Sequence, residues 1–336
     1  NLATIYSSRA RVRRAPEEPV LPMVYSPTIC SRLIRVLFAG LLLVTATHCN
    51  NVNAGCVSPD PSCDILNLVG LYGGGESAPA AIYFIRSSSP LVFGRVDLAT
   101  NALTEFSGDF PSSPASIAVD STNGVLYYSI DSNTSIRRIG LDGSGVTVFA
   151  TDASANNIIG LYLDEERDRL YWWNVAGQMR YVNQSDGSGQ TLVRTFATAM
   201  VVGEYDRAAQ LWYAAGGTEV RTMPDDATSE SLINSAGNTI VDLDLIDENR
   251  LVAADIPNNE VTVMNRDGSG RATLVGSVMP GGQDYASSTN TLYTCDQTND
   301  RIDQLNLTTG EQSTLLQLSV GYNPVACSIQ FSTGLL

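Results

Sequence analysis

The sequence has no lysine among its 336 residues, so its 20 basic residues are all arginines, and they stand against 35 acidic residues. The formal net charge at pH 7 is −15. A surface with this excess of negative charge repels phosphate backbones, which disfavours nucleic-acid binding. The same charge suits a basic peptide ligand, a cation, or solubility alone.

Histidine is almost absent as well, since His48 is the single imidazole in the chain. If the region around it is removed from the mature protein, no imidazole remains. Ser-His-Asp chemistry, histidine general-base catalysis and histidine-ligated zinc are then excluded together. The scarcity therefore points away from the commonest hydrolase mechanisms.

Residues 1–54 differ from the rest in charge, with six arginines and two glutamates against 14 arginines and 33 acidic residues in 55–336. Within them, Val36–Ala46 is an uncharged apolar run that follows Arg32 and Arg35. A run of this length is too short to span a bilayer and is typical of a secretory signal peptide. We therefore expect cleavage after Ala54, secretion, and no membrane span in the mature chain. A signal anchor is the alternative.

Removal of residues 1–54 leaves four cysteines, an even number of the kind that an oxidising compartment favours. The preferred pairing joins Cys56 to Cys63, both in a lead-in segment over 55–77, and Cys295 to Cys327, which belong to neighbouring repeats. The other two pairings stay open. Sequons for N-linked glycans, which occupy surface turns of secreted proteins, begin at Asn133, Asn183 and Asn306.

A Leu or Ile followed by an aromatic residue or Val recurs every 40–44 residues over 78–336. A period of this length with about four short strands per unit is typical of a propeller blade. The second residues of these pairs, the marker residues, are Tyr83, Tyr127, Tyr171, Trp212, Val252 and Tyr293.

The two ends of the repeat region complement each other. Asn323–Leu336 repeats the opening of a blade and stops before a marker strand, whereas Ala81–Phe84 supplies a marker strand with no opening strand before it. A composite blade would close the ring and leave no exposed edge. The sequence predicts an all-β fold, a six-bladed β-propeller of four-stranded antiparallel blades, closed by a C-terminal strand that joins the N-terminal blade.

The marker strands carry a family pattern. Leu170–Asn174 reads LYWWN and looks like the LYWTD strand of the YWTD propellers, the class B repeats of the low-density lipoprotein receptor family. The chain resembles this family over roughly 78–336, although no blade carries YWTD intact. The resemblance implies an extracellular six-bladed propeller that binds protein ligands on one face. It also implies structural roles between blades for Asp131, Asp255 and Asp296.

Two groups of side chains are candidate binding residues. The first strands of four repeats end in Asp120, Asp164, Asp206 and Asp247. Because they recur in phase, they could form a ring that binds a cation or a basic peptide; alternatively, each carboxylate accepts backbone N–H groups of its own turn. The large aromatics Trp172, Trp173 and Trp212 either pack between blades or serve as a binding anchor at the rim.

The combined pattern favours a secreted, non-catalytic propeller that acts as an extracellular protein- or ligand-binding or scaffold module. Its expected partner is an extracellular protein or a basic peptide, and no cofactor is required. One alternative is a divalent-metal-dependent hydrolase that resembles the senescence-marker/gluconolactonase class, for which Ca²⁺ is a possible metal. No motif for its ligands is found. A second alternative is a structural subunit of an extracellular coat or filament.

Overall fold

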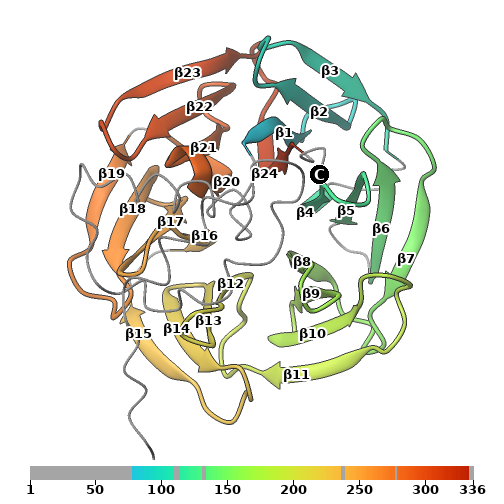
Figure 1. Cartoon of the computed structure of the whole chain (residues 1–336), viewed down its shortest axis with the longest axis vertical. Coiled ribbons are helices and arrows are strands. Elements are labelled where there is room, and N and C mark those ends of the chain that lie inside the picture. The colour runs from blue at the N-terminus through green and yellow to red at the C-terminus, as the bar shows by residue number, and fades with distance from the viewer. Residues whose placement is uncertain are drawn as a thin grey trace, which may run out of the picture. The chain divides into compact units, whose positions relative to one another are not determined.

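The computed structural model describes residues 78–108, 110, 114–130, 134–235, 239–276 and 278–332. Within these ranges the chain forms six four-stranded antiparallel sheets arranged as blades around a ring (Figure 1), which confirms the predicted fold class. The predictions for the signal peptide, the lead-in segment, Cys56, Cys63, Asp131 and Asn133 lie outside the described residues.

Each blade runs from an innermost strand beside the axis to an outermost strand at the rim (Figure 1). From the centre outward, blade A has β24 (Pro324–Phe331), β1 (Pro79–Arg86), β2 (Val92–Asp97) and β3 (Leu103–Phe106). Blade B has β4 (Pro114–Asp120), β5 (Val125–Ile130), β6 (Ser135–Gly140) and β7 (Thr147–Thr151). Blade C has β8 (Ile158–Asp164), β9 (Arg169–Asn174), β10 (Gln178–Asn183) and β11 (Thr191–Thr195).

The remaining three blades repeat this order. Blade D has β12 (Val202–Asp206), β13 (Leu211–Gly216), β14 (Glu219–Pro224) and β15 (Ser231–Ser235). Blade E has β16 (Ile240–Leu245), β17 (Arg250–Asp255), β18 (Glu260–Asn265) and β19 (Ala272–Gly276). Blade F has β20 (Pro280–Ala286), β21 (Thr291–Asp296), β22 (Arg301–Asn306) and β23 (Gln312–Gln317). One 3-10 turn, η2 (Ser287–Thr289), follows β20, and the described part holds no helix long and apolar enough to span a membrane.

The ring closes through the last strand of the chain, as predicted. Strand β24 pairs antiparallel with β1, with Tyr83 opposite Ser328. A disulfide joins Cys295 of β21 to Cys327 of β24 and so links blade F to blade A. This bond confirms the preferred pairing of these two cysteines.

The second strand of every blade is buried, and its alternate side chains face opposite neighbours. In blade C, Trp172 packs toward blade B beside Tyr127, whereas Trp173 packs toward blade D beside Trp212. These three tryptophans are at most 1% exposed. They therefore pack between blades, as the first of the two alternatives has it, and a role as binding anchors stays a prediction.

The repeat register of blade D corrects one prediction. Asp206 pairs with Leu211 as Asp164 pairs with Arg169 in blade C, which places Tyr213 and not Trp212 at the marker position. Trp212 instead occupies the place that is Ile82 in blade A and a leucine in blades B, C, E and F, and it faces blade C. The prediction chose Leu211-Trp212 because this pair shows the Leu-aromatic pattern of the other markers. In the observed register the marker pair of blade D is Trp212-Tyr213.

The departure from YWTD in blade C has a local cause. Asn174 donates from Nδ2 to the carboxylate of buried Asp152 at 2.7 Å, and Trp172 Nε1 donates to the same oxygen at 3.0 Å. An aspartate at position 174 would face Asp152 as a second acceptor. In blades E and F, where Asp255 and Asp296 remain, the carboxylates accept N–H groups of Asn258 and Asn299 in the turns that follow them.

Candidate binding face

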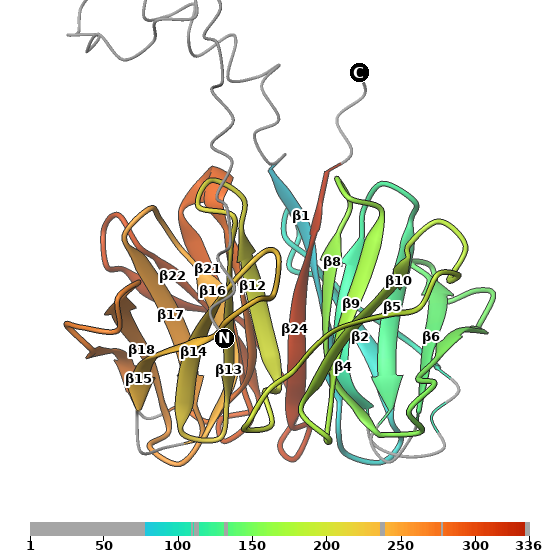
Figure 2. The same ribbon diagram turned by 90° about the horizontal axis from the view of Figure 1, so that it is seen from below.

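One face of the propeller gathers two turns from each complete blade. In an antiparallel sheet the turn after the first strand and the turn after the third strand lie at the same end, and Figure 2 shows the strands running between the two faces. We call this end the acidic face. Its described turns are 98–102, 121–124, 141–146, 165–168, 184–190, 207–210, 225–230, 246–249, 266–271, 287–290 and 307–311.

Exposed negative charge is concentrated on these turns. Three exposed arginines, Arg138, Arg207 and Arg250, lie on or next to them. Against these, the exposed acidic residues are Asp142, Glu165, Glu166, Asp168, Asp186, Asp225, Asp226, Glu248, Asp267 and Glu311. The face therefore presents an electrostatic surface that attracts cationic groups.

Three of the four predicted strand-end acids are buried beneath this face and hold their own turns. Asp120 accepts the N–H of Asn123 at 2.8 Å, and Asp206 accepts the N–H of Ala209 at 3.0 Å. Asp164 likewise accepts the N–H of Arg167 at 3.2 Å. These contacts match the alternative in which each carboxylate caps a turn.

The same three carboxylates also bond to the next blade. Asp120 accepts Gln184 Nε2 from blade C at 2.5 Å, Asp164 accepts Arg207 Nη2 from blade D at 2.8 Å, and Asp206 pairs with Arg266 from blade E. They lie at successive blade boundaries with internal partners, and the structure does not bring them together. Their role as external binding residues stays a prediction.

Asp247 does not belong to this series. It lies beyond the end of β16, is half-buried, and accepts the N–H of Asn249 at 2.8 Å and Nε of Arg250 at 2.7 Å. Ile246 occupies the equivalent place in blade E, since its N–H bonds to the carbonyl of Arg250 in the register that Asp164 shows with Arg169. The residue count along the sequence placed Asp247 at the strand-end position, but in the observed strand pairing Ile246 holds that position.

Sequence reasoning missed the residue that follows each third strand, although this residue reaches across the blade boundary. In blades B to F its N–H bonds to the carbonyl of a residue in the preceding turn of its own blade, and in blade A the N–H of Leu98 bonds to the carbonyl of Ala80 near the start of β1. The signal was available, because aligning the repeats on their third strands places these residues in one column. They are Leu98, Leu141, Gln184, Asp225, Arg266 and Leu307.

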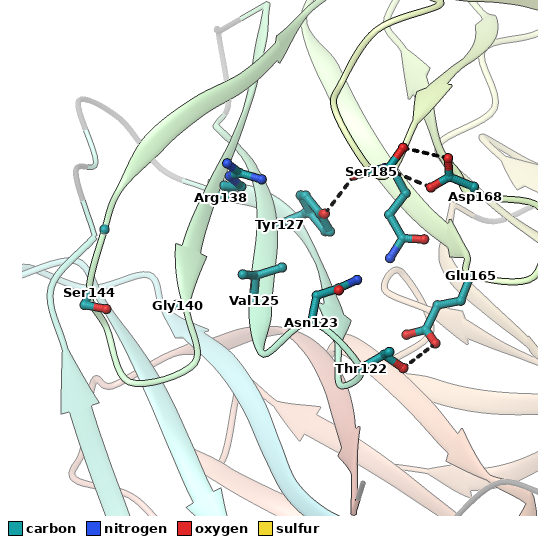
Figure 3. A pocket seen from close by; sticks show the side chains of 12 residues that line it. Thr122, Asn123, Val125, Tyr127, Arg138, Gly140, Ser144, Glu165, Asp168 and Ser185 are labelled. Carbon is teal, nitrogen blue, oxygen red and sulfur yellow. Dashed lines mark hydrogen bonds between the residues drawn. The ribbon is translucent and has the colours of Figure 1, made fainter.

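A groove of about 700 Å³ opens on the acidic face between blades B and C (Figure 3). Blade B contributes Asn123 and Tyr127, and blade C contributes Glu165, Asp168 and Gln184. The groove sits above Asp120, which Gln184 and Asn123 hold from either side.

Burial shapes the chemistry of this groove. Desolvation, followed by the nearby charge of Asp120, raises the pKa of Tyr127 to about 12, and its hydroxyl donates to the carbonyl of Gln184 at 3.4 Å. Burial also raises the pKa of Glu165, whose carboxylate accepts the hydroxyl of Thr122 at 2.9 Å. Asp168 accepts the N–H of Ser185 at 2.8 Å and its hydroxyl at 2.7 Å. Arg138 is the cation in the lining. The groove is a negatively charged recess with fixed walls.

A second acidic group, also missed from sequence, lies on the innermost strands of blades E and F. Asp242 accepts the N–H of Gln283 at 2.8 Å, and Asp244 accepts Gln283 Nε2 at 2.7 Å. Burial raises the pKa of Asp242 to about 7, and Asp284 adds to this effect. Burial, followed by the charge of Asp242, also raises the pKa of Asp244 well above its usual value. The pair shows only as alternating acids in Ile240–Leu245, a pattern that does not reveal burial.

In the described residues no group of three or more His, Cys, Asp or Glu could hold a metal ion. Calcium binding and the metal-dependent hydrolase therefore stay predictions. Of the described glycan sequons, Asn183 and Asn306 each end a third strand at the acidic face and are half-buried. Their glycosylation also stays a prediction.

The geometry defines the class of protein as a six-bladed β-propeller with an acidic, grooved face. Among solved structures it is similar to a chain in a crystal structure of a nidogen/laminin complex, with a TM-score of 0.63 and 16% identity. The match covers 75% of this chain and 98% of that one. No family model and no curated protein matches the sequence. The likeness shows the fold that the YWTD resemblance implied.

Proposed function

We propose that the protein is a secreted binding module whose acidic face captures a basic segment of an extracellular partner protein. The observation that carries this proposal is the groove between blades B and C, set in a face with ten exposed acidic side chains on its turns. A recess of this size admits side chains of a protein ligand, and its charge selects cationic ones.

The way the chain uses its own cations supports the proposal. At least eleven of the 14 described arginines form ion pairs with Asp or Glu. With no lysine, little positive charge remains to neutralise the exposed acids of the turns. The face is therefore left for a cationic partner to neutralise.

Two further observations support the location and the kind of partner. The Cys295–Cys327 disulfide suits an oxidising compartment such as the extracellular space. The chain of similar fold comes from a nidogen/laminin complex, an assembly of proteins. Both agree with a module that works by protein–protein contact outside the cell.

The test is to express the full chain in a eukaryotic host, recover it from the medium, and measure its binding to an array of extracellular protein domains. We expect partners whose affinity falls steeply between 50 and 300 mM NaCl, since screening weakens exposed charge pairs. Neutralising Asp186, Asp226 and Asp267 to Asn should weaken binding. Each Asn keeps an oxygen for the turn bond that each Asp accepts, such as Ser188 N–H to Asp186 at 2.9 Å.

The matched control changes the hydroxyl partners in the same turns, Ser188, Thr228 and Ser269, to Ala and leaves the charge unaltered. Binding that survives the acid-to-amide change, or that falls equally in this control, contradicts a charge-based contact on the acidic face. Retention of the chain inside the cell contradicts secretion.

A further inference from the structure

The crevice between blades C and D, next to the groove, is filled by one of the chain's own arginines. Arg167 donates from Nε to Asp164 at 2.6 Å and from Nη1 to Asp225 at 2.6 Å. Its guanidinium lies 3.7 Å from the ring centroid of Tyr205, a cation–π contact. Two carboxylates and an aromatic ring thus enclose the group.

The groove between blades B and C lacks that arginine, and Gln184 stands there at the repeat position that Asp225 holds beside Arg167. Asn123 stands at the position of Arg167, three residues after the strand-end acid in both blades. Its backbone N–H and its Nδ2 bond to Asp120 at 2.8 and 2.9 Å, just as the backbone N–H and Nε of Arg167 bond to Asp164. Asn123 therefore makes the inner contacts but leaves the outer space, the groove, unfilled.

The boundary between blades D and E also holds an arginine of the chain next to a strand-end aspartate and a tyrosine ring. Arg266 reaches from blade E to Asp206, and its guanidinium lies 5.8 Å from the ring centroid of Tyr213. Of the three successive boundaries that carry a strand-end Asp, two hold a guanidinium from the chain. The third is open.

The open groove offers partners of the same chemistry. Glu165 and Asp168 line it from blade C with exposed carboxylates, whereas Tyr127 of blade B is only 2% exposed and packs on Phe149. Two carboxylates recognise a planar guanidinium better than a compact ammonium, because the guanidinium pairs in a bidentate way.

We propose that the groove between blades B and C binds an arginine side chain of the partner, in the manner in which Arg167 fills the adjacent crevice. The inference rests on the proposed function and names its recognition element. The partner supplies the guanidinium that position 123 lacks.

Fluorescence anisotropy of the full chain with extended Gly/Ser peptides that carry one central Arg, Lys, citrulline or Gln tests this directly. Citrulline keeps the shape of arginine and removes its charge. We expect the arginine peptide to bind about tenfold more tightly than the lysine peptide, and the two neutral peptides to bind more weakly still. Equal signals for arginine and citrulline, including no binding of either, overturn the inference.

Two variants locate the site. Glu165→Gln with Asp168→Asn should lower arginine-peptide affinity by about tenfold or more, whereas Glu248→Gln with Glu311→Gln, the same charge change elsewhere on the face, should have little effect. Asn123→Arg should abolish peptide binding by filling the groove from within, and its melting temperature should not fall. Full peptide binding by Asn123→Arg overturns the assignment.

These outcomes separate the two proposals. If the arginine peptides fail while partners from the domain array still bind in a charge-dependent way, the proposed function stands and the groove assignment falls. If the array yields no partner, the proposed function falls whatever the peptides show.

Discussion

Gln184 of blade C donates from Nε2 to Asp120 of blade B at 2.5 Å, across the boundary between the two blades. At the boundary between blades D and E the equivalent pair is Arg266 with Asp206. At the boundary between blades E and F it is Leu307 with Ile246, and these two side chains pack in one apolar cluster. These three boundaries thus have a two-residue lock, which is amide–carboxylate, guanidinium–carboxylate or apolar, whereas at the boundary between blades C and D the equivalent residues Asp164 and Asp225 are both carboxylates and Arg167 bridges them. The members must match each other, but the chemistry of the pair is free to vary.

Replacing one member of a lock should destabilise the fold, and replacing both should restore it. Asp206→Ala leaves the part-buried Arg266 without its carboxylate, so we expect a loss of about 2 kcal/mol or more in the free energy of unfolding. The double variant Asp206→Ile with Arg266→Leu copies the Ile246–Leu307 pair and should recover most of this loss in urea titrations. A double variant no more stable than the single one contradicts the lock.

Loss of the disulfide should weaken ring closure. The Cys295–Cys327 bond closes a loop with a sequence separation of 32, for which chain entropy predicts about 3–4 kcal/mol. We expect Cys295→Ser with Cys327→Ser to unfold at a lower urea concentration than the oxidised protein, with a similar slope. Equal midpoints for the oxidised and the double-serine proteins would contradict a role in closure.

Stability should fall as the pH rises through neutrality because of the buried acids of blades E and F. The pKa of Asp242 is about 7 in the folded state and about 4 in an unfolded chain. Between these values the folded state retains a proton that the unfolded chain has released, so stability decreases with rising pH. Asp244, whose pKa is also raised, acts in the same direction.

The measurement is the melting temperature of the wild type and of Asp242→Asn with Asp244→Asn from pH 4 to pH 9. The variant should gain on the wild type as the pH rises, because an amide needs no proton. Glu248→Gln, an exposed change, serves as the control. The difference between the two curves isolates these groups from the turn aspartates such as Asp142, whose lowered pKa acts only at acidic pH. A constant difference across this range would contradict the raised pKa values.

Calcium should leave the thermal stability unchanged. The carboxylates of Asp120, Asp164 and Asp206 already accept donors from the protein, which a metal would have to displace. We expect melting temperatures in EDTA and in millimolar calcium to agree within about 1 °C. A rise of several degrees would revive the metal-dependent hydrolase and justify assays with lactones and esters.

Replacing Asn174 by the aspartate of the YWTD pattern should be harmful. Asn174→Asp places a second carboxylate against Asp152 and removes the 2.7 Å donor, so we expect a loss of about 1–3 kcal/mol at pH 7. Lowering the pH toward 4 should recover part of it, since one of the two acids can then hold a proton. Adding Asp152→Asn should also rescue the variant. A stable Asn174→Asp protein at pH 7 would show that Asn174 is not required as a donor.

The sequence was sufficient to predict the six blades, their closure and the Cys295–Cys327 bond, because these depend on strand alternation and on a repeat counted along the chain. It placed the marker of blade D at Trp212 instead of Tyr213, since both follow the same local pattern. For Asp120 the sequence offered two roles, a binding residue and a turn cap, and the bond from the Asn123 N–H matches the second.

The groove could not be predicted in this way. It exists because Asn123 is shorter than Arg167 at one repeat position, and this difference matters only when neighbouring blades lie side by side. The burial of Asp244 and the half-buried state of Asp242 were equally hidden, because alternating acids look the same on an exposed strand and on a strand at the centre of a ring.

The pairing of β24 with β1 has a consequence for the order in which the molecule is assembled on the ribosome. Blade A lacks its innermost strand until residues 324–331 have been synthesised. Until then the inner edge of β1 is unpaired, while the strands of the other five blades have all been made. A chain interrupted before Pro324 would keep that edge, a template for association with other strands. The yield of folded protein would then depend on completing synthesis of the chain through β24, and less on how early the other blades fold.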